Sequence, residues 1–499
     1  MNVKKILKEG IWIYVLMFIA AIAGYFVRVL YARSFSIVEY GLFYAVLSFM
    51  FILSPLRELG FNAANTFFMN RYVAKKEYGK AKAVFIIGLA TQLILSIALA
   101  AIIYYLKPYL IAHFFKNPLA GAMIDILLIY SVVDVIITPL SNIFICFQKN
   151  FLFQLRDHLI VILTFFFSLL LYKLNFSIIL APLSYLFAGL AVLIIYIALY
   201  KVKLKQLHVP PQYNKKIIKD TFFYSIVVSI GSFAWIILGQ LNTNLLTWLK
   251  GLESVGYYNI VLPSLQIVFL LTGPVLNTLF SVTVNLFHNK RTRELSSLSS
   301  FVYNNFLIFT LPLASILFVY SREIIKFIFG IKYIAASAAL KLYIIFWIFI
   351  FFRHVNFTLL EAIGEVRYSS KILWLEVAFD FVIGIILIQF FDYTGAVIAA
   401  GMGSVVMTLV TYNFLRKKIA IKIDYRQQCK ILMAGLVFLL SAIFLERRFF
   451  ASIGRWAVVI DGFIVLFISS ILYLICLIAM KVITKEKIDF FRSLIHQRN

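Results

Sequence analysis

The feature that most constrains the fold is a series of long apolar segments that runs through the whole sequence. Hydrophobic residues make up 63% of the chain, charged residues make up 14%, and the mean hydropathy is +0.96. A transmembrane helix needs about 20 predominantly apolar residues. The pattern therefore predicts an all-α integral membrane protein with about 14 transmembrane helices. The fourteen segments are 11–32, 41–69, 83–106, 123–147, 157–172, 178–200, 221–248, 256–287, 298–320, 342–360, 372–391, 395–415, 431–445 and 457–480.

The formal net charge of +26 also fits a membrane protein, because the basic residues are unevenly distributed. They gather in the N-terminal segment and in the even-numbered connections, for example in residues 71–82, 201–219 and 416–430. Cytoplasmic loops of membrane proteins carry such an excess of Lys and Arg. We therefore expect a multi-pass protein of the cell membrane, with both termini in the cytoplasm, surrounded by membrane lipids and without a nucleic-acid partner.

The cysteines and histidines form no recognisable metal or catalytic pattern. Cys146 and Cys476 lie in apolar segments, and Cys429 lies in a basic connection. No P-loop, zinc-binding His-Glu-x-x-His or Gly-x-Ser-x-Gly motif occurs in a usable context. The sequence thus favours a transporter over an enzyme and predicts no cofactor, with coupling to a Na⁺ or H⁺ gradient left open.

A weak internal repeat suggests that the chain consists of two related halves. Residues 38–44 resemble residues 253–258, and residues 65–68 resemble residues 277–280 at nearly the same offset. Many transporters are built from such repeats around a central substrate site. Six segments in each half give the two halves the same orientation, so the halves should be related by a pseudo-twofold axis along the membrane normal.

This repeat predicts four parts of the chain. Residues 1–200 form an N-terminal six-helix bundle, and residues 201–220 form a basic cytoplasmic linker. Residues 221–417 form a C-terminal six-helix bundle. Residues 418–499 hold helices 13 and 14 and a basic cytoplasmic tail. We expect the protein to act as a monomer.

The second apolar segment is interrupted by a proline and by charged residues at membrane depth. Pro55 removes a helical hydrogen bond, and Arg57 and Glu58 follow it directly. An arginine at the bilayer centre costs about 2.5–3.5 kcal/mol on insertion scales, so Arg57 should face a cavity or a paired acid. The eighth segment carries Gly273-Pro274, and interrupted helices at corresponding places in two halves indicate a substrate site.

Three arginines within the apolar segments are candidate substrate-binding residues: Arg57, Arg353 and Arg28. A planar guanidinium suits bidentate binding of phosphate, so the three could hold a diphosphate headgroup. Two alternatives remain open. Arg28 could reach the outer membrane interface, and Arg57 and Arg353 could each pair with an acid for a structural reason.

Several acids within the apolar segments are candidates for lining the cavity or for ion coupling. Asp134 belongs to a stripe of polar residues at helical spacing in the fourth segment, where it could pair with an arginine or bind an ion. Glu376 and Asp380 are one helical turn apart in the eleventh segment. Glu58 is the fourth acid of this group.

Three short stretches carry a resemblance to a known family. They are residues 32–43 (ARSFSIVEYGLF), residues 59–62 (LGFN) and residues 239–242 (GQLN), the last followed by Gly-Tyr-Tyr at 256–258. In these places the chain resembles the polysaccharide transporters, which are Wzx-type flippases of O-antigen and other lipid-linked oligosaccharides. These belong to the multidrug/oligosaccharidyl-lipid/polysaccharide (MOP) exporter superfamily.

The resemblance implies both an architecture and a substrate. Two bundles would form a V around a central cavity, and they would carry a polyprenyl-phosphate- or diphosphate-linked glycan from the cytoplasmic to the outer leaflet by alternating access. Gln240 and Asn242 become cavity or coupling candidates by the same resemblance. Family members often have an aspartate where this chain has Asn242, so an ion-coupling role at this position is in doubt.

Two other functions compete with this interpretation. A multidrug or cation exporter of the same fold would need acids in its cavity, whereas the charges deepest in the apolar segments are mostly arginines. A membrane enzyme that polymerises or transfers lipid-linked glycans would need an outer domain or loop with catalytic acids and histidines. The longest predicted outer connection, residues 321–341, is short and basic.

Overall fold

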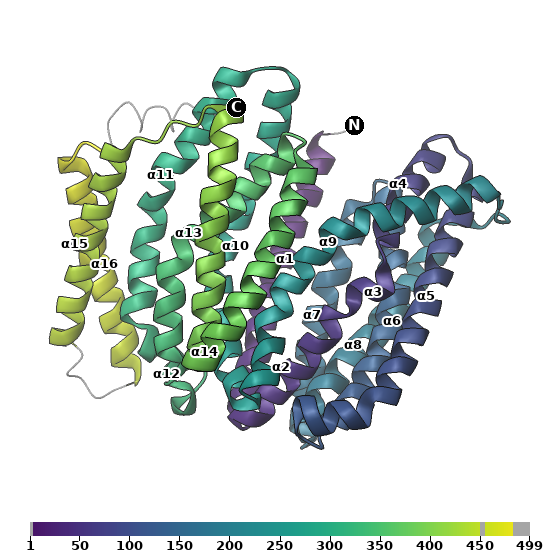
Figure 1. Ribbon diagram of the computed structural model, residues 1–499, viewed down its shortest axis with the longest axis horizontal. Helices are drawn as coiled ribbons and strands as arrows, with labels where there is room; N and C mark the ends of the chain where they lie inside the picture. The colour runs from purple at the N-terminus through teal and green to yellow at the C-terminus, as the bar shows by residue number, and fades with distance from the viewer. Residues whose placement is uncertain (1–2, 450–454, 483–499) are drawn as a thin grey trace. The chain divides into compact units, whose positions relative to one another are not determined.

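The computed structural model describes residues 3–449 and 455–482, and these residues form helices and connections without any strand (Figure 1). The basic tail expected at the C-terminus lies almost wholly outside the described residues. In chain order the elements are α1 (Val3–Ser34), α2 (Ile37–Ile52), α3 (Ser54–Glu58), α4 (Phe61–Ala74), α5 (Tyr78–Tyr109), the π-helix η1 (Leu110–Phe115), α6 (Ala120–Cys146), α7 (Asn150–Lys173), α8 (Leu180–Lys203), the 3₁₀-helix η2 (Lys205–Leu207), α9 (Lys215–Leu249), α10 (Leu252–His288), α11 (Thr292–Val319), α12 (Ser321–Ile328), the 3₁₀-helix η3 (Ile331–Tyr333), α13 (Ala336–Ala362), α14 (Val366–Ile419), α15 (Tyr425–Phe449) and α16 (Arg455–Ala479).

The helices confirm the all-α membrane fold, and the count of fourteen spans is approximate. In the described part of the chain, 11 helices are long and apolar enough to cross a membrane, or 12 if the bent α9 is one span. The 54-residue α14 covers two of the expected spans, which are joined at Asp392 with a backbone φ of 56°. The eighth expected span corresponds to α10, which runs through Gly273-Pro274 as one helix, so the interruption expected there does not break the helix.

Contacts between residues divide the chain into two units. The first comprises Met1–Pro263 and Leu373–Ala396, and the second comprises Ser264–Ile372 and Val397–Asn499. Helix α9 joins the first unit because it packs against α2, α4 and α5. These units are defined by contacts between residues, whereas the two predicted six-helix bundles are defined by the internal repeat. The two bundles therefore remain a prediction.

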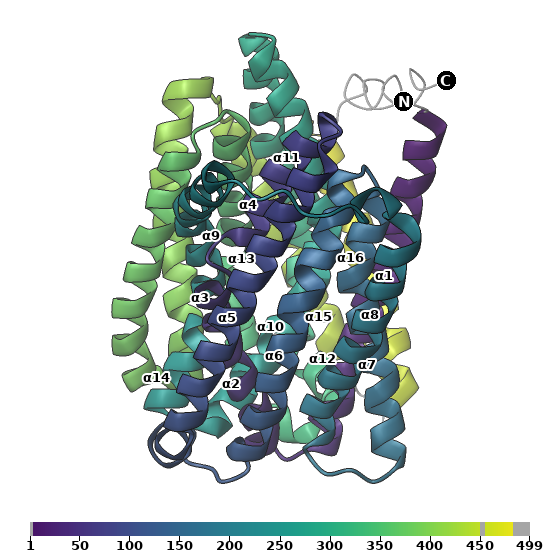
Figure 2. The same ribbon diagram turned by 90° about the vertical axis from the view of Figure 1, so that its right-hand side faces the viewer.

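The first unit is built from long helices that run alongside one another (Figure 2). Helix α1 packs on α7, and α6 packs on α5, α7 and α8. The expected linker, residues 201–220, packs against the first unit. Leu204 and Leu207 are fully buried, and the Gln212 backbone N–H donates to the Gly79 carbonyl at 2.9 Å. The connection therefore lies against the beginning of α5.

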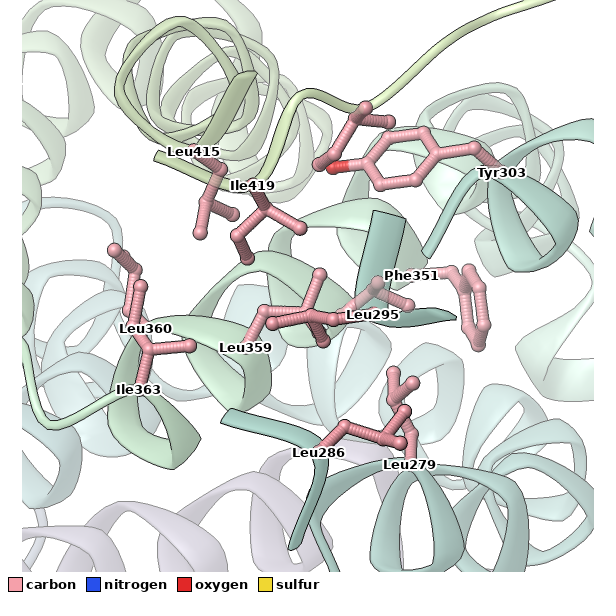
Figure 3. Packing of buried hydrophobic residues seen from close by; sticks show 12 residues of the cluster. Leu279, Leu286, Leu295, Tyr303, Phe351, Leu359, Leu360, Ile363, Leu415 and Ile419 are labelled. Atoms are coloured by element: carbon pink, nitrogen blue, oxygen red, sulfur yellow. The ribbon is translucent and has the colours of Figure 1, made fainter. Parts of the chain in front are cut away.

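The second unit has its own apolar core, formed by α10, α11, α13 and the end of α14 (Figure 3). The buried residues of this core are Leu279, Leu286, Leu295, Tyr303, Phe351, Val355, Leu359, Leu360, Ile363, Leu415, Ile419 and Ile421. Helices α15 and α16 pack on each other, and α15 packs on α11. Their own buried cluster includes Phe438 and Tyr473, so the last two helices are docked on the unit by apolar packing.

Candidate functional site

The second membrane segment is divided twice, and the short helix between the two breaks carries Arg57 and Glu58. Helix α2 ends at Ile52, and Pro55 stands in the first turn of α3, where a missing N–H costs little. The interruption expected at Pro55 is thus present as a break between α2 and α3. The second break, at Leu59 and Gly60, was not expected; both residues have left-handed backbones, with φ of 40° and 73°.

Gly60 is required at the second break by a neighbouring backbone. A Cβ atom at this position would lie 2.2 Å from the Ser225 carbonyl oxygen of α9. No side chain fits in that distance, and glycine also adopts the left-handed backbone without strain. The unwound backbone between α3 and α4 is thus held within the protein, which is where membrane proteins tolerate non-helical segments.

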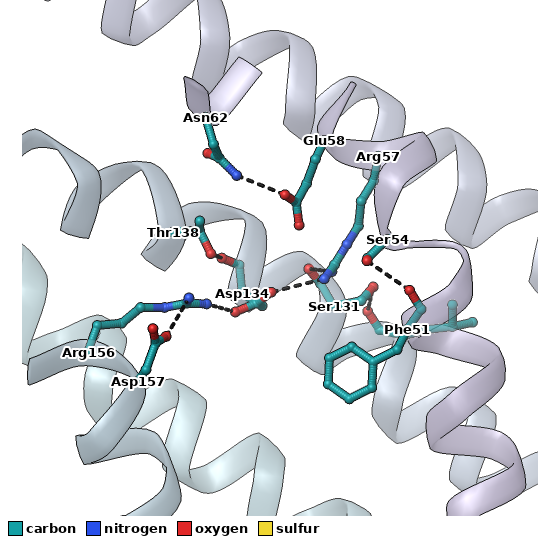
Figure 4. Close-up of polar contacts among 11 residues, drawn as sticks. Phe51, Ser54, Arg57, Glu58, Asn62, Ser131, Asp134, Thr138, Arg156 and Asp157 are labelled. Atoms are coloured by element: carbon teal, nitrogen blue, oxygen red, sulfur yellow. Dashed lines mark hydrogen bonds and ion pairs between the residues drawn. The ribbon is translucent and has the colours of Figure 1, made fainter. Parts of the chain in front are cut away.

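Arg57 is bound by an acid of α6, as one of the two interpretations of its charge expected (Figure 4). Its Nη2 atom lies 2.9 Å from Asp134 Oδ2, and its Nη1 donates to the Ser131 carbonyl at 2.6 Å. The Arg57 side chain is 7% exposed and the Asp134 side chain is 11% exposed. In this conformation both terminal nitrogens of Arg57 are occupied by the protein.

A further arginine of this network, Arg156, was missed in the sequence. It donates to the other oxygen of Asp134, and its Nη1 lies 2.8 Å from Asp157 Oδ1. Its span was expected to begin at residue 157, which left Arg156 in a loop, but α7 begins at Asn150. The apolar run that precedes Arg156 in the sequence, Phe-Leu-Phe at 151–153, was the available signal.

The space beside Arg57 is too small for a headgroup. A cavity of about 10 Å³ is lined by Arg57, Ser96 and Ser131 together with apolar side chains of α2, α5 and α6. This volume holds about one water molecule. Arg57 Nε and Ser96 Oγ have no hydrogen-bond partner among the described residues, so a water in the cavity would satisfy both. The prediction that Arg57 binds substrate therefore requires another conformation.

Arg28 differs from Arg57 because no carboxylate neutralises it in the described part of the chain. It is half-buried in α1, and its Cζ lies 4.9 Å from the centroid of the Tyr44 ring in α2. Tyr40 packs on Tyr44 with ring centroids 4.7 Å apart. Arg28 Nη1 is buried without a hydrogen-bond partner in the described structure. Arg28 thus offers a donor to an anion in an aromatic setting.

Arg353, the third candidate, lies in α13 of the second unit. It is 9% exposed, and its Nη2 is 3.4 Å from His354 Nε2. A role in substrate binding remains a prediction for this residue.

Three of the candidates for ion coupling, Asn242, Glu376 and Asp380, lie where α9 meets the first half of α14. Glu376 and Asp380 are 1% and 2% exposed, and they precede Gly384 by successive turns of one helix face. A Cβ atom at Gly384 would lie 3.5 Å from Asn242 Oδ1, which has no hydrogen-bond partner among the described residues. The structure therefore places Asn242 beside the face that carries both acids.

Gln240 has a backbone role that the structure shows directly. Its carbonyl accepts hydrogen bonds from Ser48 Oγ at 3.2 Å and from Asn244 Nδ2 at 2.9 Å. The side chain of Asn244 also donates to Ser48 Oγ at 2.9 Å. These bonds join α2 to α9, and a cavity role for the Gln240 side chain remains a prediction.

The fold is shared with transporters of known structure. The MurJ lipid II flippase in an inward closed conformation superposes with a TM-score of 0.73 and 16% identity, covering 94% of this chain and 100% of MurJ. An inward-facing multidrug resistance transporter of the MATE family gives a TM-score of 0.63 and 16% identity, covering 82% of this chain and 94% of that chain. The protein is therefore a multi-pass membrane protein with the fold that these MOP-superfamily structures share.

The sequence comparisons define the family. Residues 6–280 match the family described as polysaccharide biosynthesis protein, and the chain belongs to this family. An uncharacterized membrane protein of Methanocaldococcus jannaschii, MJ1068, is 28% identical over 457 residues, covering 89% of this chain and 90% of that protein.

Proposed function

We propose that this protein is a flippase that moves a polyprenyl-phosphate- or diphosphate-linked glycan across the cell membrane by alternating access. Transport runs from the cytoplasmic to the outer leaflet, and the product is used in the synthesis of a cell-surface glycan. The protein works as a monomer with both termini in the cytoplasm. Membership of the polysaccharide biosynthesis family supports this proposal, and so does the fold shared with a lipid II flippase.

The observation that carries the proposal is that Arg28, half-buried in α1, has no acid partner in the described structure and a buried Nη1 without a hydrogen-bond partner there. A cation at membrane depth is costly unless it is paired, so an unpaired one indicates a ligand of opposite charge. Phosphate matches the fork of guanidinium donors, and the Tyr44 ring supports the flat face of Arg28 at 4.9 Å. In an exporter of organic cations, this positive charge would repel the substrate.

Arg57 and Arg28 take different parts in this proposal. Arg28 has no acid partner to release among the described residues, whereas Arg57 must first release Asp134 Oδ2, from which it is 2.9 Å away. Arg156 keeps Asp134 neutralised after such a release. In the second unit, Arg353 is the candidate for binding the same kind of group.

The proposal is tested by transport in vesicles with a fluorescent lipid-linked oligosaccharide. Equal amounts of folded wild type and of the Ala variants of Arg28, Arg57 and Arg353 are compared, with Arg322→Ala as the control because Arg322 is exposed on α12. Losing one charged hydrogen-bonding partner costs about 1.5–3 kcal/mol, which is roughly a tenfold to hundredfold loss of affinity. Arg28→Lys should restore transport only in part, because lysine lacks the bidentate fork.

Two results would contradict the proposal. Full transport by Arg28→Ala and Arg353→Ala would show that these guanidiniums do not bind the headgroup. Transport of an organic cation such as ethidium, without movement of the lipid-linked oligosaccharide by the wild type, would favour a multidrug exporter of the same fold.

A further inference from the structure

Beside Arg57 lies a second group of polar side chains, which the ion pairs do not include. We call it the Glu58 cluster; it consists of Glu58 at the end of α3, Asn62 and Asn65 on α4, and Gln92 on α5. Asn62 Nδ2 donates to Glu58 Oε2 at 2.9 Å, and Gln92 Nε2 donates to Asn62 Oδ1 at 3.3 Å. Figure 4 shows Asn62 reaching Glu58 while Arg57 points to Asp134.

Among the charged residues of this region, Glu58 differs from the others because its charge is not balanced by an ion pair in the described structure. Arg57 and Arg156 are the cations of the network, and Asp134 and Asp157 neutralise them. Glu58 makes no ion pair in the described part of the chain; its observed partner is the uncharged amide of Asn62. An ionised carboxylate at membrane depth needs a positive charge from elsewhere.

The neighbouring amides supply oxygen atoms that have no hydrogen-bond partner among the described residues. Asn65 is 2% exposed, and neither its Oδ1 nor its Nδ2 has a partner in the described structure. Gln92 is fully buried, and its Oε1 is likewise without a partner. Buried polar atoms in native proteins are nearly always bonded, so unbonded ones indicate a water or an ion that completes the site.

Gly88 provides the room for these amides. It lies one turn before Gln92 on α5, and a Cβ atom there would be 2.2 Å from Asn65 Nδ2 and 2.3 Å from Asn65 Oδ1. Long side chains on a helix lean toward the preceding turn, so the Gln92 side chain extends over Gly88 as well. Because Gln92 bonds to Asn62 and Gly88 faces Asn65, both amides lie between α4 and α5.

The other elements around α3 bring no further charge to this place. Between Lys82 and Lys107, α5 has no charged residue, and α9 has none between Asp220 and Lys250. Helix α2 has only Glu39, in its first turn. Helix α4 has only Arg71, in its last turn, so the charged groups that act on Glu58 are Arg57, Arg156 and Asp134.

We propose that the Glu58 cluster is a binding site for one monovalent cation, a sodium ion or a proton, at the break between α3 and α4. A sodium ion would take its ligands from the Glu58 carboxylate and from the amide oxygens of the cluster. A proton would neutralise Glu58 directly. A single carboxylate with uncharged oxygens suits one positive charge, and the described residues contain no group of three or more His, Cys, Asp or Glu side chains placed to hold a metal ion.

The site stands apart from the acids of α14 and does not rest on the proposed cargo. It lies at unwound backbone within a membrane segment, a place where transporters commonly bind coupling ions. Occupation of the site would change the charge next to Arg57 and Asp134. Binding is measured on the purified full chain without any lipid-linked glycan, so a failed flippase assay leaves this inference intact.

The first experiment measures binding of ²²Na⁺ to purified protein in detergent, with choline chloride keeping the ionic strength constant. In the sodium case, Glu58→Gln lowers the affinity at least tenfold, while it keeps an acceptor for Asn62 and hence the fold. Asp125→Asn is the matched control, because Asp125 already has Lys107 Nζ at 2.8 Å. Asp380→Asn tests the other candidate region, and loss of binding there without loss in Glu58→Gln would overturn the proposal.

The second experiment measures protons released on raising the pH, for wild type and Glu58→Gln. In the proton case, the one proton missing from the variant is released well above the pH of about 4.3 at which a solvated glutamate titrates. Release near that pH, combined with ²²Na⁺ binding that does not depend on Glu58, refutes the cation site. Both results are read only on protein that elutes as a single peak and melts like the wild type.

A third variant tests the geometry without touching the charge. Gly88→Ala places a methyl group where the Asn65 amide lies and should lower cation affinity at least tenfold. Gly462→Ala is its control, because a Cβ atom there has no neighbour within 4 Å. Unchanged cation binding in a folded Gly88→Ala protein would remove Asn65 and Gln92 from the site.

Discussion

Gly41 and Gly256, the equivalent glycines of the internal repeat, pack against each other at the starts of α2 and α10. A Cβ atom at Gly41 would lie 1.8 Å from the Leu252 carbonyl oxygen, and one at Gly256 would lie 2.6 Å from the Ile37 carbonyl oxygen. Ile37 and Leu252 are themselves equivalent at the same offset. Reciprocal contacts of this kind are what a twofold axis between two related elements produces. The contact therefore supports the repeat proposed from the sequence.

Enlarging either glycine should destabilise the protein. We expect Gly41→Ala to cost roughly 1–3 kcal/mol or more, because the backbone of α10 cannot move away as a flexible side chain could. Gly256→Ala should cost less, since its closest contact is longer. Thermal melting of purified protein checks the order, with Gly239→Ala as the control because a Cβ atom there meets nothing within 4 Å. Equal melting temperatures for Gly41→Ala and Gly239→Ala would contradict the close contact.

Replacing Asp134 should lower the thermal stability more than replacing Arg57. Asp134→Asn leaves Arg57 and Arg156 without their shared acid, and removing one partner of a buried pair typically costs about 3–5 kcal/mol. Arg57→Ala should cost less, because Asp134 keeps Arg156. The double variant should regain part of the loss of Asp134→Asn, since Arg156 still has Asp157 at 2.8 Å. Melting temperatures of the three variants decide this, and a larger loss in Arg57→Ala than in Asp134→Asn would exclude the shared role.

Restoring an acid at Asn242 should alter the ion dependence of transport. Asn242→Asp adds a carboxylate beside the helix face of Glu376 and Asp380, where a third negative charge favours uptake of a cation or a proton. We expect the sodium or pH dependence of transport to shift while the folded yield stays near that of the wild type. Transport with unchanged dependence on both ions would show that Asn242 is not at a coupling site.

The orientation of the chain can be tested with single cysteines. Cysteines placed at Lys203 and Lys418 should be labelled only from the cytoplasm, because both lie in the last turn of a helix that leads into a stretch rich in basic residues. A cysteine at Lys116, which is exposed between η1 and α6, should be labelled from outside intact cells. The background has Cys429→Ser, because Cys429 is exposed. Labelling of either the Lys203 or the Lys418 position from outside would contradict the predicted orientation and, with it, the proposed direction of transport.

The membrane class, the helical architecture and the break at Pro55 could all be predicted from the sequence. These features depend on local composition: a run of about 20 apolar residues spans a membrane, and proline interrupts a helix wherever it stands in the interior. The repeat at Gly41 and Gly256 could also be found, because equivalent positions keep short sequence matches. The boundary between the eleventh and twelfth expected spans could be predicted as well, because α14 consists of two helices that meet at a non-helical residue, Asp392.

Only the tertiary structure decided which charged residues are paired. The sequence shows Arg28, Arg57 and Asp134 as similar intramembrane charges, but the ion pairs that join α3, α6 and α7 form only after the helices have packed. Arg156 was assigned to a loop because helix ends cannot be placed from hydropathy when charged residues flank an apolar run. Ion pairing depends on distances of a few ångströms between residues far apart in the chain, and such distances are a property of packing rather than of composition.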